Sequence, residues 1–168
     1  EYKKVIPKGF VRIQAKIAEL TDQGIEVYFF LGNHDMWMKK YFSEELGVVM
    51  VENELQVRIN EQLFYISHGD GLGPGDYGYK FIKKVFRNRI CQFLFSLIHP
   101  SLGLTVANYF SKRSRSYTGD DDDSFSQKEN EWLYLFCKEK LKSQHFDYFI
   151  FGHRHLPMEV TVESSKYI

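Results

Sequence analysis

The pattern of apolar and polar positions predicts helices that alternate with short strands. A first helix can open at Pro7 and end at Gly24 in a left-handed cap. Its apolar positions keep helical spacing at Phe10, Ile13, Ile17 and Leu20. The next run, Ile25 to Leu31, is short and rich in aromatic residues, which favours a buried strand. A helix that leads into a buried strand through a tight turn predicts an α/β fold.

The rest of the chain continues this alternation. Predicted strands cover 48–50, 54–59, 62–67 and 146–151, and predicted helices cover 39–46, 77–111 (in two or three pieces, broken near Pro100) and 126–143. Asn60 and Glu61 predict a two-residue hairpin turn. Ser126 to Glu129 form a capping box at the start of the last helix. Residues 160–168 predict a strand, a turn and the beginning of another strand.

Length and composition narrow the class of protein. A chain of 168 residues is expected to form one domain, and its zero formal net charge gives no global attraction to nucleic acid or anionic lipid. Cys91 and Cys137 have no C-x-x-C spacing, so we expect packed free thiols, with a disulfide as the alternative. Because Glu1 is not a Met and the chain stops at the start of a strand, we expect residues 1–168 to be a truncated domain.

Three polar loops that follow predicted strands contain the candidate chemistry. Their sequences are Gly32-Asn33-His34-Asp35, His68-Gly69-Asp70 and Gly152-His153-Arg154-His155. Ligands bind at the carboxyl ends of strands in α/β sheets, and imidazole, amide and carboxylate groups suit divalent Mn, Fe or Zn. For each histidine alone, a structural hydrogen-bonding role is the alternative. Together the three loops predict a metal site.

These loops resemble three motifs of the calcineurin-like metallophosphoesterases: G-N-H-[DE], a single His, and G-H-x-H, in that order. The resemblance implies a two-sheet β-sandwich flanked by helices, with two divalent metals on strand-end loops. It implies that Asn33, His68 and His153 hold one ion and that His155 holds the other. His34 would act catalytically beside the leaving group, as a proton donor or charge stabiliser.

Two further motifs of that family, D-x-H and G-D-x-x-D, have no counterpart in the expected place. The stretch Gly119 to Asp123 matches G-D-x-x-D formally, but it follows GNHD and no apolar strand leads into it. In the family this motif supplies the carboxylate that bridges both ions. We therefore expect an incomplete sandwich and a chain that is inactive by itself, although its parent protein is an enzyme.

A helical insert is predicted at 71–125, between the HGD and GHxH loops, with a mobile loop at 112–125. It has an apolar stretch from Ile90 to Ile98, which is far shorter than the about 20 residues that cross a bilayer. Basic residues precede this stretch at Lys80, Lys83, Lys84, Arg87 and Arg89. The stretch can cover an acyl chain or lie in a membrane interface, with the cations near phosphates. The alternatives are a packed core and a solvated helix face.

This insert is similar to that of the UDP-2,3-diacylglucosamine diphosphatases of lipid A biosynthesis. The resemblance implies hydrolysis of the pyrophosphate bond of UDP-2,3-diacylglucosamine to lipid X and UMP, in the cytoplasm or peripherally on the inner membrane. Substrate-binding residues by this resemblance are Asp76, Tyr79, Lys112, Arg113 and Arg115. The chain departs from many members of the group at His34, where they have Arg.

Other functions stay open from the sequence. One is a phosphoesterase for another substrate, either a nucleotide or a phosphoprotein. The other is a lipid-binding or partner-binding module without catalysis, which the missing motifs would fit. Mn²⁺ is the first expectation for the metal, with Fe or Zn as alternatives, and no nucleic-acid partner is expected.

Overall fold

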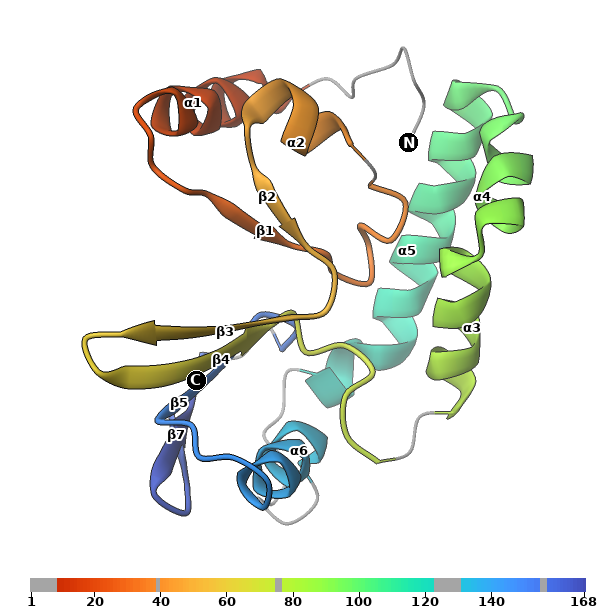
Figure 1. The fold of residues 1–168 in the computed structure, drawn as a ribbon. Coiled ribbons are helices and arrows are strands. Elements are labelled where there is room, and N and C mark those ends of the chain that lie inside the picture. The colour runs from red at the N-terminus through yellow and green to blue at the C-terminus, as the bar shows by residue number, and fades with distance from the viewer. Residues whose placement is uncertain (1–8, 39, 75–76, 123–130, 155–156) are drawn as a thin grey trace. The chain divides into compact units, whose positions relative to one another are not determined.

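The computed structural model of the 168-residue chain describes residues 9–38, 40–74, 77–122, 131–154 and 157–168. For 114–122 it describes the backbone alone. The chain divides into two compact units, most of whose elements are labelled in Figure 1. The first unit consists of Glu1–Glu52 with Ile82–Ser111, and the second consists of Asn53–Phe81 with Lys112–Ile168.

The first unit begins with two helices and a small parallel sheet. These elements are α1 (Val11–Asp22), β1 (Tyr28–Phe30), α2 (Tyr41–Leu46) and β2 (Val49–Val51). Strands β1 and β2 pair in parallel, with Phe29 opposite Met50. The Thr21 hydroxyl donates a 2.7 Å hydrogen bond to the Leu46 carbonyl, which joins the end of α1 to the end of α2. Gly47 follows in the left-handed conformation that commonly ends a helix.

The predicted insert is helical in three pieces. They are α3 (Tyr77–Arg87), α4 (Arg89–Ser96) and α5 (Pro100–Asp122). The break between α3 and α4 lies at Asn88, whose side chain accepts hydrogen bonds from the amides of Ile90 and Cys91 as an N-cap. Pro100 begins α5, as expected for a residue without an amide donor, and the predicted break near it is confirmed.

The end of α5 differs from the sequence prediction. Residues 112–125 were predicted as a mobile loop, but the structure describes 112–122 as the last part of a helix. Adding one residue to an existing helix forms a hydrogen bond at little further cost, so a polar stretch can continue a helix that it would not start. Residues 123–125 lie outside the described part of the chain.

The second unit is built on a five-stranded mixed sheet of order β3-β4-β5-β7-β6. Its strands are β3 (Glu54–Ile59), β4 (Gln62–Ser67), β5 (Tyr148–Phe151), β6 (Val160–Val162) and β7 (Ser165–Tyr167). The β3–β4 hairpin is confirmed, since Asn60 and Glu61 both have positive φ (48° and 67°), which a type I′ turn requires. Strand β4 runs parallel to β5, and β5 runs parallel to β7.

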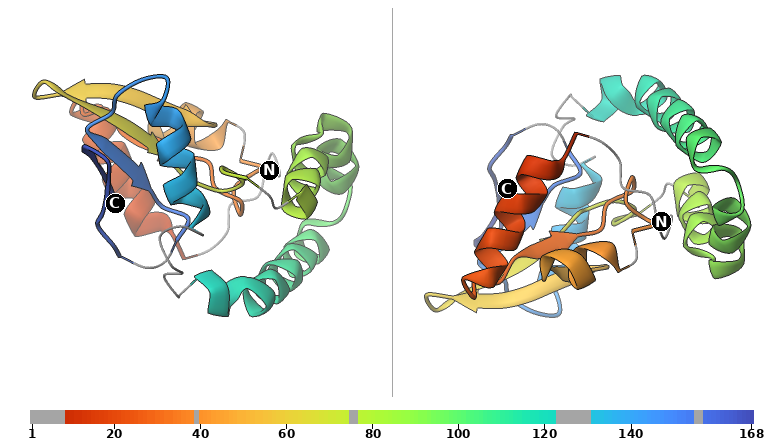
Figure 2. Two further views of the ribbon diagram at one scale, coloured as in Figure 1. Left: turned by 90° about the horizontal axis from the view of Figure 1, so that it is seen from below. Right: turned by 90° about the horizontal axis from the view of Figure 1, so that it is seen from above.

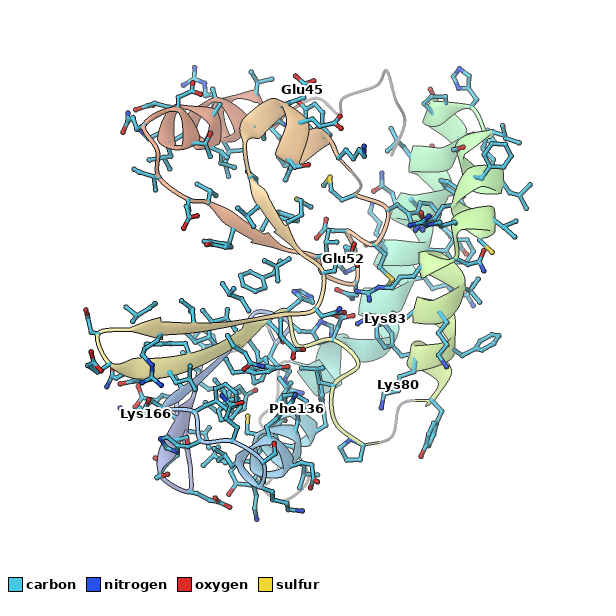
Figure 3. All side chains as sticks on the ribbon, in the orientation of Figure 1. Glu45, Glu52, Lys80, Lys83, Phe136 and Lys166 are labelled. Atoms are coloured by element: carbon cyan, nitrogen blue, oxygen red, sulfur yellow. The ribbon has the colours of Figure 1, made fainter. Side chains whose placement is uncertain are left out.

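Helix α6 (Trp132–Leu141) covers one face of this sheet (Figure 2). Leu133 and Cys137 are four residues apart on one side of the helix, and both are fully buried. The core that they join also contains Tyr65, Phe146, Phe149, Val160, Val162 and Tyr167. Phe136 of the same helix, labelled in Figure 3, packs against this core. The capping box predicted at 126–129 lies outside the described residues.

Both cysteines are free thiols, as predicted. Burial raises the pKa of the Cys137 thiol well above its ordinary value, so this thiol packs as a small apolar group. The mixed α/β class is also confirmed by the two sheets and by the helices of the described residues. The two-sheet sandwich and the boundaries 1–168 and 71–125 stay predictions, because each unit is described by itself.

We expect Phe149→Ala to lower the free energy of unfolding by about 3–5 kcal/mol, because it leaves a cavity in the core under α6. Ile59 of the same sheet is the control, since its side chain is 46% exposed whereas Phe149 is 0% exposed. Ile59→Ala should cost about 1 kcal/mol or less. Urea unfolding followed by circular dichroism measures both, and equal losses would contradict this assignment of the core.

Candidate metal centre

Two histidines of the second unit, His68 and His153, lie at neighbouring strand ends. Strands β4 and β5 are parallel, and Ser67 is opposite Phe151 at the end of both. His68 follows the first strand directly, and His153 follows the second after Gly152. The carboxyl ends of adjacent parallel strands open at the same edge of a sheet, so the pairing register brings the two histidines together.

Backbone hydrogen bonds hold these two loops against each other. The amides of Gly152 and His153 donate to the His68 carbonyl at 3.1 and 2.8 Å. Gly69 has φ +102°, and a Cβ there would lie 3.3 Å from the Phe151 side chain. A side chain at Gly69 would therefore be strained and crowded, which explains why glycine follows His68.

The imidazole rings of this pair face each other through nitrogen atoms. His153 Nδ1 lies 3.3 Å from His68 Nε2, and both side chains are half-buried. Two nitrogens bound to one tetrahedral ion at about 2.0–2.1 Å would be roughly 3.3 Å apart. The pair therefore has a spacing that fits joint binding of one divalent ion, and imidazole nitrogen is a suitable donor for such an ion.

The loop after His68 is attached to the start of helix α3. The Tyr79 hydroxyl donates a 2.6 Å hydrogen bond to Oδ2 of Asp70, a carboxylate that is 5% exposed. Lys80, which Figure 3 labels on α3, donates through Nζ to the Gly73 carbonyl at 2.7 Å. Tyr79 was predicted as a substrate-binding residue, and the structure places it in contact with the HGD motif.

The GNHD motif belongs to the first unit and forms turns after β1. Asn33 is half-buried and His34 is exposed. His34 Nδ1 lies 3.2 Å from the Ser111 hydroxyl on α5, so this helix contacts the loop. The Asp35 amide donates to the Gly32 carbonyl at 3.1 Å, which closes the turn.

Trp37 connects the same loop to helices α3 and α4. Its indole Nε1 donates a 2.8 Å hydrogen bond to the Phe86 carbonyl. Its ring centroid lies 4.1 Å from that of Phe95 and 5.7 Å from that of Phe86. Gln92 adds a bond from Nε2 to the Phe86 carbonyl at 3.0 Å. Three helices of the predicted insert therefore contact the segment that carries His34.

The histidine pair is the part of the predicted metal site that the structure brings together. Asn33 and His34 lie in the other unit, and His155 lies outside the described residues. In the part of the chain that the structure describes, no three His, Cys, Asp or Glu side chains lie close enough to hold a metal ion.

Comparison with known proteins gives relatives that share one name. A UDP-2,3-diacylglucosamine hydrolase of Porphyromonas gingivalis (strain ATCC BAA-308 / W83) is 34% identical over 99% of this chain and 68% of its own length. Proteins of the same name from Yersinia pseudotuberculosis serotype O:1b (strain IP 31758) and Yersinia pestis bv. Antiqua (strain Angola) are 29% identical over 90% of this chain. The chain spans 62% of their length. No family model matches it.

This chain belongs to the UDP-2,3-diacylglucosamine hydrolase family. The relationship confirms the resemblance inferred from the motifs, and with it membership of the calcineurin-like phosphoesterases. Metal-dependent hydrolysis of phosphate compounds is the chemistry that this membership implies.

The structure describes only some of the remaining predicted substrate-binding residues of this hydrolase-family chain. Lys112 and Arg113 are exposed residues of α5, and Arg115 is described only as part of the same helix. Asp76 lies outside the described residues. Their roles stay predictions.

The apolar stretch of the insert is not packed core. In α4 and its C-cap, four apolar side chains at positions i, i+3, i+4 and i+7 form one exposed face of the helix. They are Ile90, Phe93, Leu94 and Leu97, with 69%, 61%, 58% and 68% exposure. Among the described helices, none has the length and apolar content needed to cross a membrane.

Two buried residues near the histidine pair were missed from the sequence. Glu131 is 1% exposed, and one of its carboxylate oxygens lies 3.4 Å from a guanidinium nitrogen of Arg154. Arg154 stood only as the variable position of GHxH, and Glu131 fell inside the helix predicted over 126–143 without a role of its own. The sequence shows both charges but not their burial, so no signal distinguished them from surface residues.

Replacing Trp37 by Phe tests the contact between the GNHD loop and the insert. The variant keeps an aromatic ring beside Phe95 but loses the indole donor. Because Gln92 still donates to the Phe86 carbonyl, the loss should be near the lower end of the usual range, about 0.5–1 kcal/mol. Trp37→Ala also loses the ring contacts of this partly buried side chain and should cost more, about 2–3 kcal/mol. Urea unfolding measures both, and equal costs would show that the rings contribute nothing.

Proposed function

We propose that this chain contributes to a metal-dependent hydrolase that cleaves the pyrophosphate bond of UDP-2,3-diacylglucosamine, giving lipid X and UMP. The observation that carries the proposal is the pair of facing imidazoles at the ends of β4 and β5, in a chain whose relatives have that hydrolase name. The chain spans 68% and 62% of the length of two of these relatives, so the proposed activity is that of the whole enzyme and not of this chain by itself.

The donor set suits two divalent ions, with Mn²⁺ as the first expectation and Fe or Zn as alternatives. His68, His153 and Asn33 would hold one ion, and His155 would hold the other. When bound, such ions supply Lewis acidity that withdraws charge from phosphoryl oxygens. The role of the chain itself is to hold neutral imidazoles at fixed positions on strand ends, which are stiff supports.

His34 would stabilise or protonate the leaving group. Its contact with Ser111 is compatible with this role: in the tautomer in which the Ser111 hydroxyl donates to Nδ1, the ring proton lies on Nε2. That nitrogen can then donate to an oxygen of the substrate. Ser111 would act as a positioning residue that selects this tautomer.

The exposed apolar face of α4 would contact the acyl chains of the substrate. Helix α4 has apolar groups on its exposed side as well as Phe95 on the side that faces Trp37. Exposed apolar groups concentrated on one helix face mark a binding surface. Lys83 of α3, labelled in Figure 3, and its neighbour Lys84 precede α4 in the sequence. They would supply cations for the phosphate groups of the substrate. A peripheral position on the cytoplasmic side of the inner membrane fits such a substrate.

The test uses the natural full-length protein with UDP-2,3-diacylglucosamine and measures release of UMP. We expect release with Mn²⁺ and none after removal of metal by a chelator. His68→Ala and His153→Ala should lose bound metal and activity together. His34→Ala should keep the metal and lower turnover by about 10²–10⁴-fold, because its proposed role lies in the transition state.

Two results would count against this function. Good turnover of a nucleotide or phosphoprotein without UMP release would indicate a phosphoesterase for another substrate. Binding of the lipid without hydrolysis of any phosphate compound would indicate a non-catalytic binding module. Loss of metal in His34→Ala would show that this histidine is a ligand.

The acyl-chain role of α4 has its own prediction. Leu94→Glu places a charge on the apolar face and should raise KM for the diacylated substrate at least about 10-fold. Turnover of a small soluble phosphodiester should not change. Ile13→Glu is the control, because Ile13 of α1 is exposed to nearly the same extent (60% against 58% for Leu94). An equal effect of both variants, or an effect on the soluble substrate, would exclude a specific acyl-chain surface.

A further inference from the structure

An ion pair is buried at the start of helix α6. Glu131 is the N-cap residue of this helix, but its side chain makes no capping hydrogen bond. Its carboxylate is instead directed at Arg154, with 3.4 Å between Oε2 and a guanidinium nitrogen. The side chains are 1% and 7% exposed. A buried carboxylate is strongly unfavourable without a compensating charge, so the position of Glu131 depends on Arg154.

Arg154 belongs to the GHxH motif and lies between its two histidines. Its backbone is therefore part of the loop that carries them, and a fixed guanidinium restrains that loop. On the preceding side, the His153 amide is bonded to the His68 carbonyl at 2.8 Å. The loop is thus held both to the sheet and, through the ion pair, to α6.

The next residue of α6 contacts the adjacent histidine. The Trp132 ring meets the His153 ring edge-on, with centroids 5.8 Å apart and planes at 72°. Two consecutive residues of the helix start therefore contact two consecutive residues of the motif.

The same helix start also touches the loop that follows His68. Gly73 has φ +75°, and a Cβ there would lie only 2.5 Å from the Trp132 carbonyl oxygen. The chain can approach this closely only because residue 73 is glycine. The beginning of α6 therefore contacts both loops that carry the histidine pair.

We propose that Glu131 is a positioning residue for the metal site, and that it acts through Arg154 to fix the loop that carries His153. The inference rests on the proposed metal-binding role of that loop. A buried pair that served only stability could be replaced by apolar side chains of similar volume, often without loss. An ion pair next to a metal ligand has a further effect. Residues outside the ligand shell orient the ligands and thereby change the affinity for the metal.

The experiment measures Mn²⁺ binding to the metal-free natural protein by isothermal titration calorimetry, together with thermal unfolding in chelator. Glu131→Gln keeps the shape of the side chain and removes its charge. It should weaken Mn²⁺ binding by about 10- to 100-fold. Glu139→Gln is the matched control on the same helix, where the Glu139 side chain is 74% exposed. It should leave Mn²⁺ affinity unchanged.

A second variant separates positioning from stability. The double variant Glu131→Leu with Arg154→Met replaces the pair by apolar groups, and it serves also if Glu131→Gln does not fold. Folded protein with Mn²⁺ binding weakened about 10-fold or more supports the proposal. Parental Mn²⁺ affinity in either variant overturns it, even if the unfolding temperature in chelator falls.

Mn²⁺ binding by a third variant, His153→Ala, distinguishes failure of this inference from failure of the proposed function. His153→Ala should lose Mn²⁺ binding at the site. If it binds Mn²⁺ like the parent protein, the proposed metal role of the GHxH loop is wrong and the inference fails with it. If His153→Ala loses Mn²⁺ but Glu131→Gln does not, only the role of Glu131 is wrong.

Discussion

The parallel pairing of β4 with β5 is the constraint on which the site of the second unit depends. Because Ser67 and Phe151 are opposite each other at the ends of these strands, His68 and His153 emerge at one edge of the sheet. A shift of the register by one residue would send the side chains of one strand to the other face. The buried aromatic side chains of β5 oppose such a shift, since Phe149 would lose its place in the core under α6. The same burial that stabilises the sheet thus fixes the histidine pair.

Elements distant in sequence support each group of candidate site residues. In the first unit, Trp37 and Ser111 connect the GNHD loop to helices α3, α4 and α5. In the second unit, α6 contacts the two histidine loops through Glu131 and Trp132. Loops contribute few buried apolar groups of their own, so their order comes from such contacts with helices and strands.

Local patterns predicted much of this structure. Strands 54–59 and 62–67 and the hairpin at Asn60 were predicted with their observed bounds, because alternation and turn residues act over a few positions. The three histidine motifs led to the correct family for the same reason. Strand β1 is shorter than the predicted run from Ile25 to Leu31, and α5 continues beyond residue 112. Strand ends depend on the partner strand and helix ends on the preceding turns, and neither is visible in a short window of sequence.

The sequence shows which residues are charged or apolar, but it did not predict which of them are buried. Glu131 follows a predicted capping box and Arg154 stands between two histidines, and neither residue was assigned a role from the sequence. Tertiary packing removes both from water at once.

Conversely, Ile90, Phe93 and Leu94 are apolar at helical spacing, which usually indicates a core face, yet they are exposed. A buried ion pair and an exposed apolar face are both energetically unfavourable, because charged groups prefer water and apolar groups prefer the core. Such features cost stability, so they are expected where a site or a binding surface needs them. One of them lies in the GHxH loop, and the other lies on a helix that contacts the GNHD segment through Trp37, which is why both are interpreted as functional features.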